Sequence, residues 1–123
     1  VVTLQYADLP PTSALKVLIV FETANNLPSG QQAILYGKTV RNYLDTKCVT
    51  GPDNKTKEYR IWDKDVVLTG ESAFWKALVT NSRTLATPLP HIIITNDTGT
   101  VRFEGPLPAN VTDTLTLLKK YGG

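Results

Sequence analysis

The run Val17-Leu18-Ile19-Val20-Phe21 constrains the fold more than any other part of this chain. An unbroken apolar run of this length, bounded by polar residues, is typical of a strand that is buried on both faces in the middle of a sheet. A sheet buried on both faces needs a helical layer on each side. The run therefore predicts a central strand over residues 16–21 of an α/β domain.

After Asn26-Leu27-Pro28-Ser29 the apolar residues recur at steps of three and four. The stripe consists of Ala33, Tyr36, Val40, Tyr43 or Leu44, and Lys47 or Cys48. This spacing predicts one amphipathic helix over residues 30–48, capped by the Ser29 hydroxyl. Cys48 then faces inward, as free cysteines usually do.

The remaining expected elements are a strand over 58–62, a helix over 71–79, hairpin strands over 91–95 and 100–104, and a helix over 110–121. In the hairpin, Gly99 suits a positive φ, and Val101 and Phe103 share one face. Asn110 caps the last helix and Gly122 ends it. The order predicts a mixed central sheet of four or five strands with helices on both faces. Its first two core strands are parallel, and its hairpin is antiparallel.

The chain of 123 residues is most economically one domain, and its 41% apolar content supplies a core without metals or disulfides. We expect an N-terminal strand or arm over residues 1–15 and a single domain over residues 16–123. In the arm Val2, Leu4 and Tyr6 alternate, as an added edge strand does. One alternative function is therefore a structural component of a larger assembly, docked through this arm.

Charge and composition exclude several kinds of function. The net charge of +2 comes from 13 basic and 11 acidic residues, and the basic residues are scattered, so we expect a solvated surface and no nucleic-acid partner. These residues include Lys38, Arg41, Lys47, Lys55, Lys57, Arg60, Arg83 and Arg102. No apolar run approaches the ~20 residues of a membrane span, so we expect no membrane insertion. The first residues lack a signal-peptide pattern, but a mature N-terminus looks the same, so the compartment stays open.

Cysteine and histidine occur once each, as Cys48 and His91. An intrachain disulfide, a cysteine-based zinc site and a histidine-rich metal site are therefore not expected. We predict no metal and no cofactor.

Two stretches, together with the element order, resemble the thioredoxin superfamily. The first is "VLIVFETANNLPSGQQ", which is similar to the strand that leads into the CGPC motif at the first turn of the family's long helix. Aligned without a gap, the two motif cysteines fall on Asn26 and Ser29. Leu27 takes the glycine position and Pro28 the proline position.

The second stretch is "LPHIIITNDTGTVRFEG", which resembles the family's cis-proline loop, strand, turn and return strand. Pro90 matches the cis-proline, Leu89 the residue before it, and Gly105 the glycine before the last helix. The resemblance covers about residues 15–121. It implies a thioredoxin-like domain whose groove beside Pro90 presents backbone to an extended peptide.

The family's chemistry does not carry over to this chain. Dithiol exchange needs one thiolate to attack and a second thiol to resolve the mixed disulfide, and Asn26 and Ser29 carry no sulfur. The family's buried acid falls on Val20. The resemblance therefore implies no catalytic residues and no enzyme of this kind. We predict a redox-inactive domain that binds a protein or peptide.

The predicted groove is lined by Asn26, Leu27, Pro28, Leu89 and Pro90. An exposed apolar patch around Leu27 and Leu89 would distinguish this groove from a leftover loop. Two alternatives place chemistry elsewhere: a single-thiol redox protein that uses Cys48, or a Ser29 nucleophile with His91 as its base. The sequence leaves the partner, the compartment and the oligomeric state open.

Overall fold

The computed structural model describes residues 14–22, 27–84 and 89–123 of the chain. Its elements are, in order, β1 (Leu15–Phe21), α1 (Ser29–Tyr36), α2 (Thr39–Lys47), β2 (Tyr59–Asp63), α3 (Ala73–Ser82), β3 (His91–Asn96), β4 (Val101–Pro106) and α4 (Val111–Gly122). The core strands and the later two helices lie where the sequence predicts them, within 3 residues at each end. The predicted N-terminal arm falls, up to residue 13, outside the described residues.

Within the described residues, the sheet has 4 strands in the order β2-β1-β3-β4. β1 pairs in parallel with β2 and antiparallel with β3, and β3 and β4 form an antiparallel hairpin. The parallel pair and the antiparallel hairpin are both as predicted.

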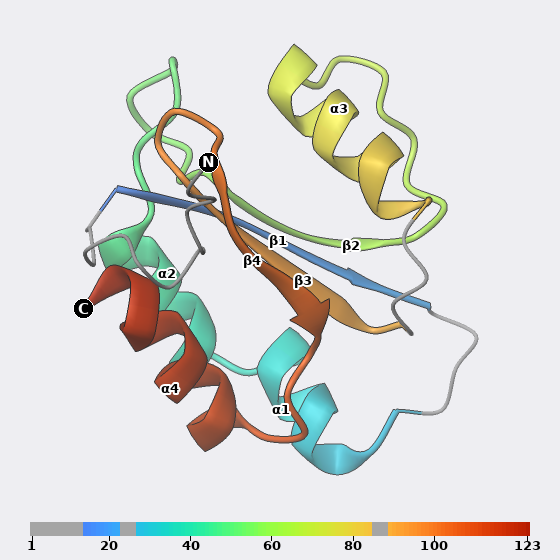
Figure 1. Ribbon diagram of the computed structural model, residues 1–123, viewed down its shortest axis with the longest axis vertical. Coiled ribbons are helices and arrows are strands. Elements are labelled where there is room, and N and C mark those ends of the chain that lie inside the picture. The colour runs from blue at the N-terminus through green and yellow to red at the C-terminus, as the bar shows by residue number, and fades with distance from the viewer. Residues whose placement is uncertain (1–13, 23–26, 85–88) are drawn as a thin grey trace, which may run out of the picture.

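Helices cover both faces of this sheet (Figure 1). α1, α2 and α4 lie on one face, and α3 lies on the other. β1 serves both layers: Leu15, Val17 and Ile19 enter the core of α1, α2 and α4, whereas Leu18 and Val20 enter the core of α3. The prediction of a central strand buried on both faces is confirmed.

The predicted single helix over residues 30–48 is wrong, because the chain breaks it at Gly37. Gly37 is extended, with φ −83° and ψ 175°, and its N–H donates to the C=O of Ala33 at 3.0 Å. A Cβ at Gly37 would collide with that same oxygen. Only glycine fits this close approach, so α1 ends here and α2 starts after a change of direction.

The break also explains which side chains the helices bury. Val40, Leu44 and Cys48 face inward as predicted. In α1 the predicted stripe is wrong: Ala33 is exposed and Tyr36 is 66% exposed, while the neighbouring Ile34 and Leu35 are buried. A single helical phase does not hold on both sides of Gly37, because the chain changes direction there.

A β-bulge in β4 overturns the prediction that Val101 and Phe103 share a face. Phe103 pairs with Ile94, but Val101 pairs with Thr95, so Arg102 is an extra residue in the ladder. Val101 packs against the core of α3, and Phe103 packs against the opposite core.

Arg102 is buried, in contrast to the predicted solvated surface. Its exposed fraction is 1%, and its guanidinium carbon lies 5.2 Å from the centroid of the Tyr121 ring. The bulge brings Arg102 to the end of α4. There the face of the Tyr121 ring and the negative end of the helix dipole both stabilise its positive charge.

The predicted roles of Gly99 in the hairpin turn and of Asn110 as the cap of α4 are confirmed. Gly99 has a φ of +89°, and the Asn110 side-chain oxygen accepts a hydrogen bond from the N–H of Asp113 at 2.8 Å. The predicted end of α4 at Gly122 is one residue early, because Gly122 is still helical and Gly123 has a φ of +83°.

We predict that Gly37→Ala destabilises the protein by about 1–3 kcal/mol, because the new methyl group must push the last turn of α1 apart. The change in the free energy of unfolding can be measured by urea denaturation, with Lys38→Ala at the exposed neighbouring position as the control. A Gly37→Ala variant as stable as the native chain would contradict the break between α1 and α2.

Candidate functional site

The junction between β1 and α1 holds the predicted groove residues Asn26, Leu27 and Pro28. Asn26 lies outside the described residues. Leu27 is half-buried and Pro28 is exposed. The prediction that Ser29 caps the helix is wrong: Ser29 is the first residue of α1, Pro28 precedes it, and no side chain makes a capping hydrogen bond. The Pro28 C=O instead accepts the N–H of Gln31 at 3.0 Å.

The second predicted segment, Leu89-Pro90, directly precedes β3, and its peptide bond is cis. The first residue of β3, His91, pairs with Val20 on β1 and with Pro106 on β4. Because β1 ends one residue after Val20, Leu89-Pro90 and the junction leave the sheet at the same end.

Leu107 joins the two segments. Its N–H donates to the C=O of Pro90 at 3.0 Å, and its C=O accepts from the Gln31 side-chain amide at 3.2 Å. Nearby, Gly30 packs so closely on the backbone carbonyl of Ala109 that a Cβ would collide with it. Sequence patterns do not point to Gln31 or Leu107, because their roles arise only from the fold.

Leu27 and Leu89 do not form the exposed apolar patch that would distinguish a binding groove from a leftover loop. Leu27 packs against the core of α1, α2 and α4, and Leu89 packs against the core of α3. Among the described residues, the large apolar side chains that are exposed are Tyr36 and Val67. An apolar surface of Leu27 and Leu89 therefore cannot account for binding here.

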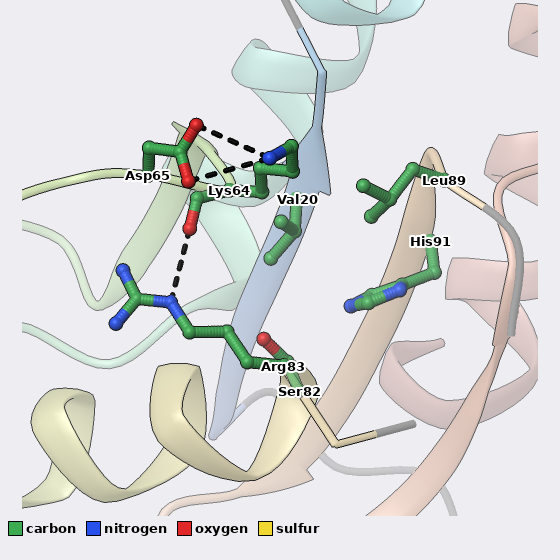
Figure 2. Close-up of a pocket in the computed structure, with 7 residues that line it drawn as sticks. All are labelled: Val20, Lys64, Asp65, Ser82, Arg83, Leu89 and His91. Carbon is green, nitrogen blue, oxygen red and sulfur yellow. Dashed lines mark hydrogen bonds and ion pairs between the residues drawn. The ribbon is translucent and has the colours of Figure 1, made fainter. Parts of the chain in front are cut away.

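A pocket of about 340 Å³ lies beside Leu89 on the α3 face of the sheet. Its lining residues are Val20, Lys64, Asp65, Ser82, Arg83, Leu89 and His91 (Figure 2). The side chains of Val20, Leu89 and His91 point into the space between β1, β3 and α3 (Figure 2). The strands thus supply one wall of the pocket, and the end of α3 supplies the other.

The charged groups at the rim are tied to one another or to backbone. The Lys64 ammonium lies 3.1 Å from the Glu22 carboxylate and 3.2 Å from the Asp65 carboxylate. These hydrogen bonds, the one to Glu22 first, raise the pKa of Lys64. Arg83 donates from Nε to the C=O of Lys64 at 3.0 Å and from Nη2 to the C=O of Val66 at 2.9 Å.

Ser29 and His91 belong to opposite faces of the sheet. His91 lines the pocket on the α3 face, whereas Ser29 begins α1, which packs on the other face. The serine that shares the pocket with His91 is Ser82, whose hydroxyl donates to the C=O of Val79 at 2.7 Å. The Ser82 hydroxyl is thus hydrogen-bonded to backbone rather than activated by a base.

Cys48 is buried, with an exposed fraction of 2%, as the helical stripe predicts. Burial raises the pKa of its thiol to about 12, and Lys57 only partly opposes this shift. A redox thiol needs access and thiolate character. Burial and the raised pKa both count against a single-thiol function at Cys48.

The described stretches hold no group of three His, Cys, Asp or Glu side chains placed to bind a metal ion. No helix in the same stretches combines the length and apolar character that a membrane crossing requires. Comparisons with protein-family models, with curated proteins and with solved structures find no match for this chain.

We predict that Cys48 of the native protein reacts slowly with a disulfide-exchange reagent such as 5,5′-dithiobis(2-nitrobenzoate), and rapidly once the protein is denatured in urea. The physical reason is that both access and ionisation are suppressed by burial. The rates are read from the absorbance of the released thiolate. Fast labelling of the native protein would restore the single-thiol interpretation.

The raised pKa of Cys48 also predicts a loss of stability at high pH. Between the ordinary value of 9.0 and about 12, the unfolded thiol releases its proton while the folded thiol keeps it. The unfolded state then binds fewer protons, so the free energy of unfolding falls as the pH rises. Urea denaturation from pH 8 to about 11 should show a shallower decline for Cys48→Ala than for the native chain. Parallel declines would contradict this assignment.

Proposed function

We propose that this chain is a redox-inactive thioredoxin-like domain that binds an extended protein segment along the backbone of Leu89. The order of elements, from the strand and helices at the junction to the final hairpin and helix, supports the thioredoxin-like part. The absence of sulfur at Asn26 and Ser29 supports the redox-inactive part, because exchange needs both thiols.

The observation that carries the binding proposal is the backbone of Leu89. Among the described residues, neither its N–H nor its C=O has a hydrogen-bond partner, although Pro90 beside it is bonded to Leu107. An N–H and a C=O on one residue form a strand-like pair with an extended segment. The fixed position of Pro90 holds that pair in place.

The edge of β2 offers little room for a competing strand. The C=O of Glu58 and the N–H of Lys64 bond to β1. In a parallel pair, the N–H and C=O groups of the odd-numbered residues between them therefore point away from β1. Of these, Tyr59 uses both its N–H and its C=O within the chain, and Asp63 uses its C=O. Ile61 alone is left between them in the described part of the chain.

The edge of β4 is closed by other means. Leu107 donates its N–H to the C=O of Pro90, so in this antiparallel pair every second residue of β4 bonds to β3. The backbone N–H and C=O positions of the residues between them, Glu104 and Pro106, point away from the sheet. Pro106 has no N–H, Glu104 carries an exposed charge, and the bulge at Arg102 interrupts the ladder. These features disfavour strand addition at this edge, which leaves Leu89 and the single residue Ile61 on β2 as candidate pairing positions.

We predict that a peptide selected for binding from a random displayed library loses affinity when the amide that pairs with Leu89 is N-methylated. One lost hydrogen bond costs about 0.5–1.5 kcal/mol, so the dissociation constant should rise about threefold to tenfold. Fluorescence anisotropy with each singly N-methylated peptide locates the position. A peptide insensitive to methylation at every amide would contradict strand-like pairing.

On the protein side, Leu89→Pro removes the amide donor, whereas Leu89→Met keeps the donor and an apolar side chain of similar size. The selected peptide should bind Leu89→Met about as well as the native chain and Leu89→Pro at least about threefold more weakly. Circular dichroism shows whether each variant is folded. Equal binding by two folded variants would contradict the role of the Leu89 backbone.

The thioredoxin-like alignment has its own test. Asn26→Cys combined with Ser29→Cys should form a disulfide under mild oxidation, because the family's pair occupies these positions and bridging needs Cα atoms within ~7 Å. The disulfide is detected by mass and by the loss of reactive thiol. Ser29→Cys alone is the control, since it has no partner on the junction. Two thiols that stay free would show that the alignment is wrong.

A further inference from the structure

We propose that the pocket beside Leu89 receives an uncharged aromatic side chain with a hydrogen-bond donor at its tip, a tyrosine or a tryptophan. This deepens the proposed function, because the segment paired with Leu89 would deliver that side chain. The chemistry of the pocket is nevertheless a property of the chain alone and can be tested without any segment.

Size and apolar lining favour one large side chain. The volume of about 340 Å³ lies at the small end of ligand pockets, which span about 300–1,000 Å³. Val20 and Leu89 supply apolar surface, and the imidazole ring of His91 lies beside them (Figure 2). An aromatic ring buries a large apolar area with few rotatable bonds, so it suits such a space.

The polar lining residue Ser82 favours an occupant with a hydrogen-bond donor. Ser82 is 2% exposed, and its hydroxyl proton is committed to the C=O of Val79 at 2.7 Å. What the hydroxyl still offers is an acceptor lone pair. A phenol O–H or an indole N–H can donate to it, whereas a phenyl ring cannot.

The rim argues against a charged occupant. Lys64 is neutralised by Glu22 and Asp65, and the Arg83 guanidinium is drawn toward the backbone C=O of Lys64 rather than into the pocket (Figure 2). A buried charge is costly unless a partner compensates it. The described charges at the rim are thus already paired with each other or bonded to backbone, so a neutral side chain is favoured.

The position of the pocket fits delivery by a paired segment. Leu89 contributes its side chain to the pocket wall, and to the proposed pairing it contributes a backbone that no described residue hydrogen-bonds. Side chains of an extended strand alternate between the two faces of a sheet. A residue of the segment that points to the α3 face would therefore enter the pocket.

The test uses the full chain and small probes of matched shape. 4-Methylphenol, toluene and 4-methylbenzoate are titrated separately, and the amide and side-chain resonances of Ser82, Leu89 and His91 are followed by NMR. We expect 4-methylphenol to shift these resonances with a dissociation constant about threefold to tenfold below that of toluene, the value of one hydrogen bond. 4-Methylbenzoate should bind more weakly than 4-methylphenol.

Two variants identify the acceptor. Ser82→Ala should abolish the difference between 4-methylphenol and toluene, while Thr80→Ala, an exposed position on the same helix, should preserve it. If Ser82→Ala does not fold, the comparison of the three probes on the native chain decides alone. Equal binding of 4-methylphenol and toluene, tighter binding of 4-methylbenzoate, or no shift at the pocket would each overturn the proposal.

These outcomes separate the pocket from the peptide site. A peptide that pairs with Leu89 while 4-methylphenol leaves the pocket resonances unchanged would overturn the pocket proposal and keep the proposed function. Specific 4-methylphenol binding without any selectable peptide would support the pocket and count against the proposed function.

Discussion

The burial of β1 on both faces is the constraint on which the rest of the structure depends. Ile19 pairs with Ile61 on β2 and with Ile92 on β3, so the register is set from both sides. If β1 shifted by one residue relative to β2 and β3, each of its side chains would move from one core to the other, because successive residues point to opposite faces of the sheet. The end of β1 therefore fixes where the junction, the Pro90 segment and the pocket lie.

The α3 side of the sheet depends on one further buried interaction. The indole N–H of Trp75 donates to the Glu58 carboxylate at 2.6 Å, and the Arg60 guanidinium lies 3.8 Å from the same carboxylate and 4.8 Å from the Trp75 ring centroid. Glu58 is only 8% exposed, so its charge needs these partners. Because Trp75 belongs to α3, this contact holds the helix whose end supplies Ser82 to the pocket.

Sequence patterns predict the strands well because each is a short, distinctive run bounded by turn residues, and Gly99 and Asn110 have local roles that composition reveals. The errors have tertiary causes. The backbone turns extended at Gly37, in a close approach to a carbonyl that only glycine fits, and this ends the helix. A bulge buries Arg102. At the site, Leu89 and Pro90 follow from the family resemblance rather than from a local pattern, and their part in binding stays a prediction. Gln31, Leu107 and Ser82 carry no local signal, since only the fold brings them to one end of the sheet.

The magnitudes show why the proposed segment would need the pocket. Two backbone hydrogen bonds at Leu89 contribute about 1–3 kcal/mol together, well short of the ~8 kcal/mol of a micromolar complex. Leu27 and Leu89 add little, because they already pack on the two cores. Burying one aromatic side chain supplies about 1.5–3 kcal/mol more. The proposed site would thus support weak, rapidly reversible binding, and a domain without exchanging thiols at the junction would have no covalent step to prolong it. Tighter binding would require a segment long enough to contact the chain beyond Leu89 and its pocket.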